Sequence, residues 1–594
     1  MILFSRRYQS MQMAKNMRAM DVAQGKGRAD LLIKNARVVN VFTKQVEEVE
    51  VAVAAGIIAW LGREGEKDTR PAAIVYDAGG KYLIPGLIDA HCHIEMSFMS
   101  AIPFAQTVIA HGTTAAVLDM HDVCNTGLDC MHNFAREVAA SPLKAFLMVP
   151  PCVPGTPKLE EAGANMTLKD MQEAFALPRI WGVAEAMDFN RILDREPEIM
   201  AILAWAREKG FRIDGHCPEL RGDDLQAYLT TGILTDHESV TLEEMLEKYR
   251  LGMKVILRRG SLEEPVRASD FINALADTSN ALLATDGCLY LDDVLDYGHM
   301  NRALKAMVAE GVDPVTAVQM GTINVARAYG FDHLMGAIAP GRCADMVLVS
   351  DLKDFDVEAV FIDGRQFEAQ DAKIPRYSYP PEILNTIKMG PVTAQTFAIT
   401  APVAAGEVTA RVMTIIDGTV ATREDHEPMA VINGQLQPDI DRDLLKVAVF
   451  DRYQEDGHHA LGIVRGFGFR KGAFAGSIGQ DSQNLVVVGA DDEDMALAVN
   501  TVRKMQGGLA AVADGVVLAQ VELPIAGIMS DLDPRELQQR FRKLHRCLGD
   551  MGGKQVNPSF TLSLLLTCAV IPELKITNRG LVDALSGEFV SLII

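Results

Sequence analysis

The stretch that decides the fold reads Leu83-Ile84-Pro85-Gly86-Leu87-Ile88-Asp89-Ala90-His91-Cys92-His93. An apolar run rich in leucine and isoleucine ends in two histidines that are separated by one residue. In a strand, residues i and i+2 point to the same side, so both imidazoles can reach one cation from the end of a single strand. On its own, the same spacing also fits a pair of half-buried surface histidines.

Other metal-ligand candidates follow further apolar runs along the chain. Glu185, His216, His237 and Asp286 each end, or nearly end, such a run. Each has a simpler alternative role: a cap or salt bridge for Glu185, a capped turn for His216, a helix start for His237 and a turn for Asp286. Their joint placement at successive strand ends instead favours a metal site at the mouth of a barrel.

Apolar runs alternate with helix-like segments over much of the chain. Glu198–Lys209 and Leu242–Tyr249 are clear amphipathic examples of those segments. Strand-then-helix units predict an α/β fold, a (β/α)8 barrel, with a doubly wound open sheet as the competing architecture. The runs that we expect to form its strands are Leu83–Asp89, Thr113–Asp119, Ala145–Val149, Ile180–Ala184, Phe211–Gly215, Gly232–Thr235, Lys254–Arg258 and Ala281–Thr285.

The chain is long enough, at 594 residues, for about two to four domains. We expect residues 1–28 to be a flexible N-terminal extension. Short β-rich segments in 29–82 and 336–371 predict one split small β-sandwich domain, closed around the inserted catalytic barrel at 83–335. The composition changes after that, and 372–594 is predicted to be an additional C-terminal α/β domain.

The composition excludes some classes of protein. A net charge of -22 argues against nucleic-acid binding, which needs basic surface, and favours a small-molecule substrate. No apolar run is long enough to span a membrane, and the N-terminus lacks the apolar core of a secretory signal. Dispersed cysteines without CxxC spacing indicate reduced thiols in a cytoplasmic protein. Cys92, Cys217 and Cys288 lie beside candidate site residues, and we expect them to be small buried apolar groups.

The candidate ligands suggest a site for two cations. The two histidines of the first run can hold one divalent cation, while His216 and His237 can hold a second. Glu185 would lie between the cations, because a carboxylate has two oxygens and can bridge them. Asp286 completes the first site and can also accept a proton. Water shared by two cations ionises near neutral pH, which provides a hydroxide nucleophile.

Motifs around these residues carry a family resemblance. In the barrel they are Asp89-Ala90-His91-Cys92-His93-Ile94-Glu95, Val183-Ala184-Glu185-Ala186-Met187-Asp188, Asp214-Gly215-His216-Cys217-Pro218 and Thr235-Asp236-His237-Glu238. In the C-terminal part they are Gly466-Phe467-Gly468-Phe469 and Asp492-Glu493-Asp494-Met495-Ala496. Together they are similar to the adenine deaminase family of the amidohydrolase superfamily, over nearly all of the chain beyond the N-terminal extension.

The resemblance implies hydrolysis of adenine to hypoxanthine and ammonia by a hydroxide that bridges two divalent metal ions. Fe²⁺ or Mn²⁺ is expected, and Zn²⁺ also suits such a site. The hydroxide would attack C6 of the purine, and Glu238 would shuttle a proton to the ring nitrogen. Asp286 would take the proton of the hydroxide and pass it to the leaving amine. Glu95 and His121 are candidate substrate contacts, although each could instead support the site structurally.

The sequence departs from the family pattern in places. The stretch after the last run reads Thr285-Asp286-Gly287-Cys288-Leu289, the seventh run ends in Arg258-Arg259-Gly260-Ser261, and a C-terminal motif reads Gln480-Asp481-Ser482-Gln483. None of these removes a candidate ligand, but all could alter substrate contacts. The alternatives are therefore another amidohydrolase acting on a different aminopurine or a cyclic amide or amidine, and a scaffold without activity. We expect the protein to form a homodimer or a larger homo-oligomer and to bind a small-molecule purine as its substrate.

Overall fold

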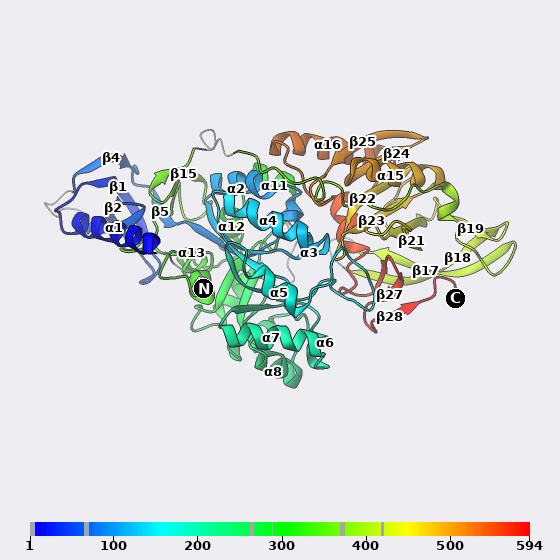
Figure 1. Ribbon diagram of the computed structural model, residues 1–594, viewed down its shortest axis with the longest axis horizontal. Helices are drawn as coiled ribbons and strands as arrows, with labels where there is room; N and C mark the ends of the chain where they lie inside the picture. The colour runs from blue at the N-terminus through cyan, green and yellow to red at the C-terminus, as the bar shows by residue number, and fades with distance from the viewer. Residues whose placement is uncertain (1–5, 64–69, 262–265, 288, 369–374, 417–420) are drawn as a thin grey trace.

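The computed structural model describes residues 6–63, 70–261, 266–287, 289–368, 375–416 and 421–594. Figure 1 shows an elongated molecule in three parts. A small sheet from the N-terminal region, in blue, lies at one end, and the barrel segments in cyan and green lie in the middle. The C-terminal part, in yellow to red, forms the other end.

The small sheet combines strands from both sides of the barrel segment. Its order is β16-β15-β14-β5-β1-β2-β3, and β4 pairs with β1. The antiparallel pairing of β14 with β5 places Met346 opposite Pro85, which ties the late strands to the early ones. The strands are β1 (Ala29–Asn40), β2 (Gln45–Ala54), β3 (Ile57–Arg63), β4 (Ala72–Asp77), β5 (Tyr82–Pro85), β14 (Met346–Val349), β15 (Val357–Ile362) and β16 (Arg365–Gln366).

The N-terminal region differs from the expected flexible extension. Helix α1 (Arg6–Ala23) packs against β2 and β3, and residues 1–5 lie outside the described residues. Ala19 and Val22, three positions apart and therefore on one helix face, are buried in a cluster with Ile57 of the sheet. The prediction missed this helix because its other face is exposed and methionine-rich, which hides the short apolar stripe that docks.

The central part is a curled sheet of parallel strands. Within the described ranges, β6 to β10 form one hydrogen-bonded sheet and β11 to β13 form another. Leu234 N donates to Ile213 O at 3.0 Å between these two sheets, and Asp286 N donates to His91 O at 3.0 Å between the last strand and the first. The strands are β6 (Leu87–Cys92), β7 (Thr113–Asp119), β8 (Lys144–Val149), β9 (Ile180–Ala186), β10 (Arg212–Gly215), β11 (Thr235–Asp236), β12 (Lys254–Arg258) and β13 (Ala281–Ala284).

The first apolar run, expected as one barrel strand, is divided between two sheets. Its first half is β5 of the small sheet and its second half is β6 of the barrel. The break falls at Gly86, where a Cβ atom would lie 2.2 Å from Thr114 Oγ1. Gly86 N donates to Asp345 O of the small domain at 2.9 Å. Pro85, which has no N–H to give to a ladder, ends the first strand.

Helices follow the barrel strands and cover the sheet. The two amphipathic segments expected from the sequence are confirmed as α7 and α9, within one residue at each end. The helices of this part are η1 (Ile94–Ser97), α2 (Ala101–Ala110), α3 (His121–Asn125), α4 (Leu128–Ala140), α5 (Leu168–Ala174), α6 (Phe189–Leu193), α7 (Pro197–Lys209), α8 (Gly222–Thr230), α9 (Leu242–Arg250), α10 (Ala268–Asn273), α11 (Leu291–Asp296), α12 (Met300–Ala309), α13 (Pro314–Met320) and α14 (Ile323–Tyr329). Among the described residues, none of the helices is both long enough and apolar enough to cross a bilayer.

The C-terminal part is built on a mostly antiparallel sheet, ordered β19-β18-β17-β21-β20-β23-β22-β24-β25. Helix α15 packs on β22, β23 and β24, and helix α16 packs on β25 and β24. Its strands are β17 (Gly406–Ile415), β18 (Thr422–Ile432), β19 (Gln435–Leu436), β20 (Leu445–Phe450), β21 (His459–Arg465), β22 (Ala473–Gly479), β23 (Asn484–Gly489), β24 (Gly508–Ala513) and β25 (Val516–Glu522), with β26 (Leu574–Thr577), β27 (Gly580–Asp583) and β28 (Glu588–Val590) in a separate small sheet. Its helices are η2 (Ala394–Phe397), α15 (Asp492–Met505), α16 (Pro534–Asp550), α17 (Pro558–Phe560) and η3 (Thr561–Leu565).

Candidate metal centre

The structure brings the six candidate ligands together at the carboxyl ends of the parallel strands. Their positions follow from the chain path, because parallel strands present these ends at one mouth. The residues are His91 in β6, His93 directly after it, Glu185 in β9, His216 after β10, His237 after β11 and Asp286 after β13.

One side of the cluster gathers the histidines of the first strand. His91 Nε2 and His93 Nε2 are 3.1 Å apart. Asp286 Oδ1 lies 3.3 Å from His91 Nε2 and 3.5 Å from His93 Nε2. Glu185 Oε1 lies 3.5 Å from His93 Nε2. Ring nitrogens and carboxylate oxygens therefore converge in a buried space, as a cation site requires.

The other side gathers the later histidines around the second oxygen of Glu185. Glu185 Oε2 lies 2.8 Å from His216 Nδ1 and 3.3 Å from His237 Nε2. The two oxygens of this carboxylate thus face different histidines. That arrangement is the one a carboxylate needs to lie between two cations. Asp286 is not confined to the first side, since its Oδ1 is also 3.9 Å from His237 Nε2.

Asp119 is a member of the cluster that the sequence analysis missed. It forms a possible ligand group with His91, His93 and Glu185. Its Oδ2 accepts a hydrogen bond from Glu185 N at 3.4 Å, while its buried Oδ1 has no hydrogen-bond partner among the described residues. The available signal was its position, because it ends the run Thr113–Asp119 as the other candidates end theirs.

The donor set fits divalent metal ions. Imidazole nitrogens and carboxylate oxygens suit iron, manganese or zinc. Burial acts to raise the pKa of Glu185, but hydrogen bonds from His216 and His237 more than offset it and hold that pKa well below its usual range. The carboxylate is therefore ionised, as a ligand must be. The buried, unpartnered oxygen of Asp119 is a further acceptor that a cation would satisfy.

An arginine joins the two candidate proton carriers. Arg258 Nη1 pairs with Glu238 Oε1 and lies 3.0 Å from Asp286 Oδ2. Arg258 ends β12, so its position at a strand end could have singled it out. Arg259, one of the departures from the family pattern, turns away from the cluster and pairs with Glu310 at 2.7 Å. That departure therefore leaves the candidate ligands untouched.

The two predicted substrate contacts lie in different surroundings. Glu95, in η1, is buried, and its Oε1 accepts from Val123 N at 3.2 Å. Burial and the neighbouring Asp122 raise the pKa of Glu95 to about 8. His121 Nε2 lies 3.7 Å from Asp481 Oδ1. Burial acts to lower the pKa of His121, but Asp481 reverses this and the pKa rises to about 9.

Buried contacts hold the strand ends that carry the later histidines. Asp236 Oδ1 accepts from Cys217 N at 2.9 Å. Lys248, which is fully buried in α9, donates to Asp236 Oδ2 at 2.9 Å and to Cys217 O at 2.7 Å. His216 and His237 are the immediate neighbours of these residues. The lysine therefore fixes the spacing of two turns at the mouth of the barrel.

The cysteines beside the cluster match their expected structural role in the described part of the chain. Cys92 and Cys217 are fully buried and free of disulfides. Burial raises the pKa of both thiols well above its usual range, so they remain neutral. Cys288 lies outside the described residues.

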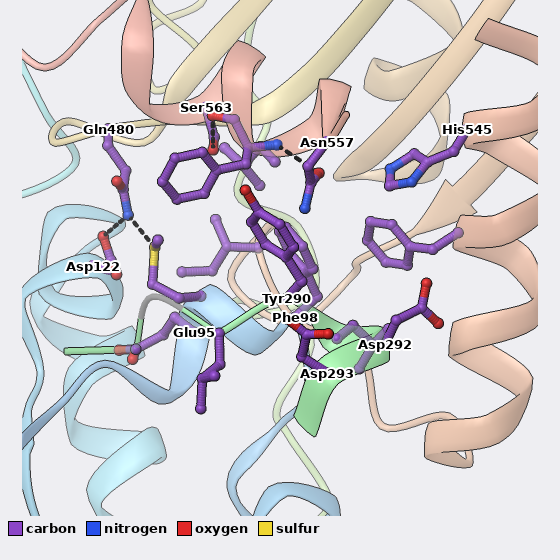
Figure 2. A pocket seen from close by; sticks show the side chains of 18 of the residues that line it. Glu95, Phe98, Asp122, Tyr290, Asp292, Asp293, Gln480, His545, Asn557 and Ser563 are labelled. Carbon is purple, nitrogen blue, oxygen red and sulfur yellow. Dashed lines mark hydrogen bonds between the residues drawn. The ribbon is translucent and has the colours of Figure 1, made fainter. Parts of the chain in front are cut away.

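A cavity of about 270 Å³ lies beside the cluster, between the barrel and the C-terminal part. Its barrel side includes Glu95, two residues after His93, Gly287, directly after Asp286, and Asp122, three residues after Asp119. Gln480 enters from the turn between β22 and β23 (Figure 2), and Gln483 of the same turn also lines the cavity. His121 is not part of this lining, so of the two predicted substrate contacts only Glu95 faces the cavity.

The fold and the cluster define a hydrolase of the amidohydrolase type, and residues 82–367 match the model of the amidohydrolase family. Residues 419–588 match a second family model, the adenine deaminase C-terminal domain. The chain belongs to the adenine deaminase family. It is 39% identical to the adenine deaminase of Desulfatibacillum aliphaticivorans over 96% of this chain and 98% of that one. The adenine deaminase of Moorella thermoacetica is 38% identical over 96% of this chain and 97% of that one. The adenine deaminase of Archaeoglobus fulgidus is 36% identical over 97% of each chain.

Proposed function

We propose that this protein hydrolyses adenine to hypoxanthine and ammonia. The observation that carries the proposal is the placement of Glu185, with one oxygen towards His93 and the other towards His216 and His237. Relatives named adenine deaminase, which align over nearly the whole chain, support the choice of substrate. The reaction breaks the C6–N bond of the purine and forms a C6–O bond from water.

Six side chains would hold two divalent metal ions, with Fe²⁺ or Mn²⁺ expected and Zn²⁺ also suited to the donors. Bound divalent ions supply Lewis acidity that brings the pKa of water close to neutral. The proposed ligands are His91, His93, Glu185, His216, His237 and Asp286.

Glu238 and Asp286 are the proposed proton carriers. Glu238 delivers a proton to the ring nitrogen next to C6, which makes that carbon a better electrophile. Asp286 accepts a proton from the attacking water and passes it to the departing amine. Arg258 Nη1 contacts both carboxylates, so one guanidinium nitrogen links the two proposed proton carriers. Glu95 contacts the substrate from the cavity wall.

The same proposal extends to the organisation of the chain. The parallel strands form a closed (β/α)8 barrel at 83–335, flanked by the split small β-sandwich domain of 29–82 and 336–371. Residues 372–594 form the additional C-terminal domain. We place the protein in the cytoplasm as a homodimer or larger homo-oligomer that acts on a free purine.

A purine panel with an ammonia assay tests the function. Purified protein should release ammonia from adenine, at a stoichiometry of one per hypoxanthine formed, and elemental analysis should find two divalent ions per chain. Other aminopurines, together with a lactam and a hydantoin, form the comparison set. Carboxylate formation from a cyclic amide without ammonia release from adenine would replace this proposal with the alternative amidohydrolase function.

A further inference from the structure

The cavity beside the cluster is built by two parts of the chain that are far apart in sequence. Phe98 of the barrel stacks on Phe541 of α16, with ring centroids 4.7 Å apart. Tyr290 meets Phe560 edge to face at 5.9 Å. All four rings line the cavity. Its walls are therefore aromatic on both sides of the boundary, which suits a flat heterocycle.

One end of the cavity carries two buried carboxyl groups. Glu95 and Asp122 are only 3% and 2% exposed. Among the described residues, neither Glu95 Oε2 nor Asp122 Oδ2 has a hydrogen-bond partner. A buried carboxylate oxygen without a partner is costly, and binding sites are where such oxygens are retained. The unpartnered oxygen of Asp122 therefore favours a ligand that donates an N–H or O–H group.

The C-terminal part holds one of these carboxylates in place. Gln480 Nε2 donates to Asp122 Oδ1 at 3.2 Å, and Gln483 Nε2 donates to the same oxygen at 2.6 Å. Figure 2 shows the Gln480 side chain directed at Asp122 across the boundary. Both glutamines are buried. Because both bind Oδ1, the second oxygen of Asp122 is left to face a ligand.

We infer that Asp122 accepts the ring N–H of a free 6-aminopurine, and that Gln480 and Gln483 are positioning residues that aim it. The inference rests on the proposed function, since it takes adenine as the substrate. It makes the C-terminal domain part of the substrate pocket. It also makes Gln480 and Gln483 determinants of substrate specificity, and both belong to a motif that departs from the family pattern.

The orientation of the substrate follows from the chemistry. The edge of adenine that carries C6 must face Glu238, and we orient the five-membered ring towards Asp122, where Gln480 and Gln483 enter the cavity. A free base carries an N–H on that ring, whereas a nucleoside carries a sugar there. A buried acceptor left unpaired discriminates strongly against a ligand without the matching donor. The cavity, at about 270 Å³, lies near the small end of ligand sites.

Glutamine variants test the positioning role. Gln483→Glu keeps the shape of the side chain but removes its N–H, and Gln480→Ala provides a second variant. Both should raise the KM for adenine about 10–100-fold with little change in kcat and unchanged metal content. The matched control is Asn578→Ala, which removes an amide contact to Glu161 across the same boundary, at 3.3 Å, away from the cavity. Its KM should remain that of the wild type.

The ring N–H is tested with 9-methyladenine, which lacks it. In the wild type, 9-methyladenine should compete with adenine only weakly. In Asp122→Asn, the preference for adenine over 9-methyladenine, expressed as the ratio of the two affinities, should fall about 10-fold or more, because the charged acceptor is lost. Suppose that the wild type releases ammonia from adenine. The inference is then overturned if the glutamine variants keep the wild-type KM and Asp122→Asn keeps the wild-type ratio of affinities for adenine and 9-methyladenine. A wild type that releases no ammonia from adenine would instead overturn the proposed function.

Discussion

At the scale of single residues, the arrangement around Glu185 separates this cluster from an ordinary group of buried histidines. Both oxygens of the Glu185 carboxylate lie near histidines, and these histidines come from different strand ends. Here Oε1 lies near His93, while Oε2 lies near His216 and His237. Carboxylates between two metal ions are held in this divided way. Glu238 lies at the edge of the cluster, 3.5 Å from His237 Nε2 and paired with Arg258. Its side chain is 19% exposed against 4% for Glu185, which leaves it placed to act on a substrate.

The roles of these two glutamates can be separated by substitution. Glu238→Gln should lower kcat by about 10²–10⁴-fold, the usual contribution of a positioned acid or base, and leave bound metal unchanged. Steady-state ammonia release and elemental analysis on one preparation measure both quantities.

Glu185→Gln is the matched comparison, since it makes the same chemical change at a proposed ligand. It should lose metal as well as activity. Loss of metal from the Glu238→Gln protein, or full metal occupancy in the Glu185→Gln protein, would reverse the two assignments.

At the scale of elements, β11 and α9 act as one support for the mouth of the barrel. Lys248 of α9 is fully buried and bonds Asp236 at the end of β11, together with Glu244 one turn earlier in the helix. Removing one member of a buried ion pair leaves an uncompensated charge. The helix therefore positions His237 through the residue that precedes it.

Lys248→Met should destabilise the protein by about 3–5 kcal/mol, because two buried carboxylates lose their cation. Urea unfolding followed by circular dichroism measures the change. Lys169→Met is the control: Lys169 also pairs with a glutamate four residues away, but on an exposed surface. That change should stay below about 1 kcal/mol. Equal effects from the two substitutions would contradict the supporting role of Lys248.

The element scale is also where the sequence was most informative. Runs such as Thr113–Asp119 and Lys254–Arg258 are confirmed as β7 and β12 with unchanged bounds. A parallel strand that is buried on both faces has a continuous apolar run in its sequence, and the first polar residue after the run marks the end of the strand. The run Leu83–Asp89 was wrong as a single strand. Nothing local in it shows that Gly86 passes between two sheets, since that close approach depends on Thr114 and Asp345.

At the scale of the whole molecule, the sequence predicted the family and the convergence of the ligands, but not the meeting of distant segments. Asp122 and Gln483 are separated by 361 positions, yet they share a short hydrogen bond at the cavity. Neither residue ends an apolar run in a pattern that marks it. The docking of α1 was missed for a similar reason, because its buried stripe gains meaning only once the small sheet is in place.

The central claim concerns two metal ions on either side of one carboxylate. Anomalous diffraction from crystals of the Mn²⁺-loaded protein tests it most directly. We predict two peaks: one within bonding distance of His91, His93 and Glu185 Oε1, the other within bonding distance of His216, His237 and Glu185 Oε2. A single peak that leaves Glu185 unbound, or peaks only at other groups of side chains, would contradict the account.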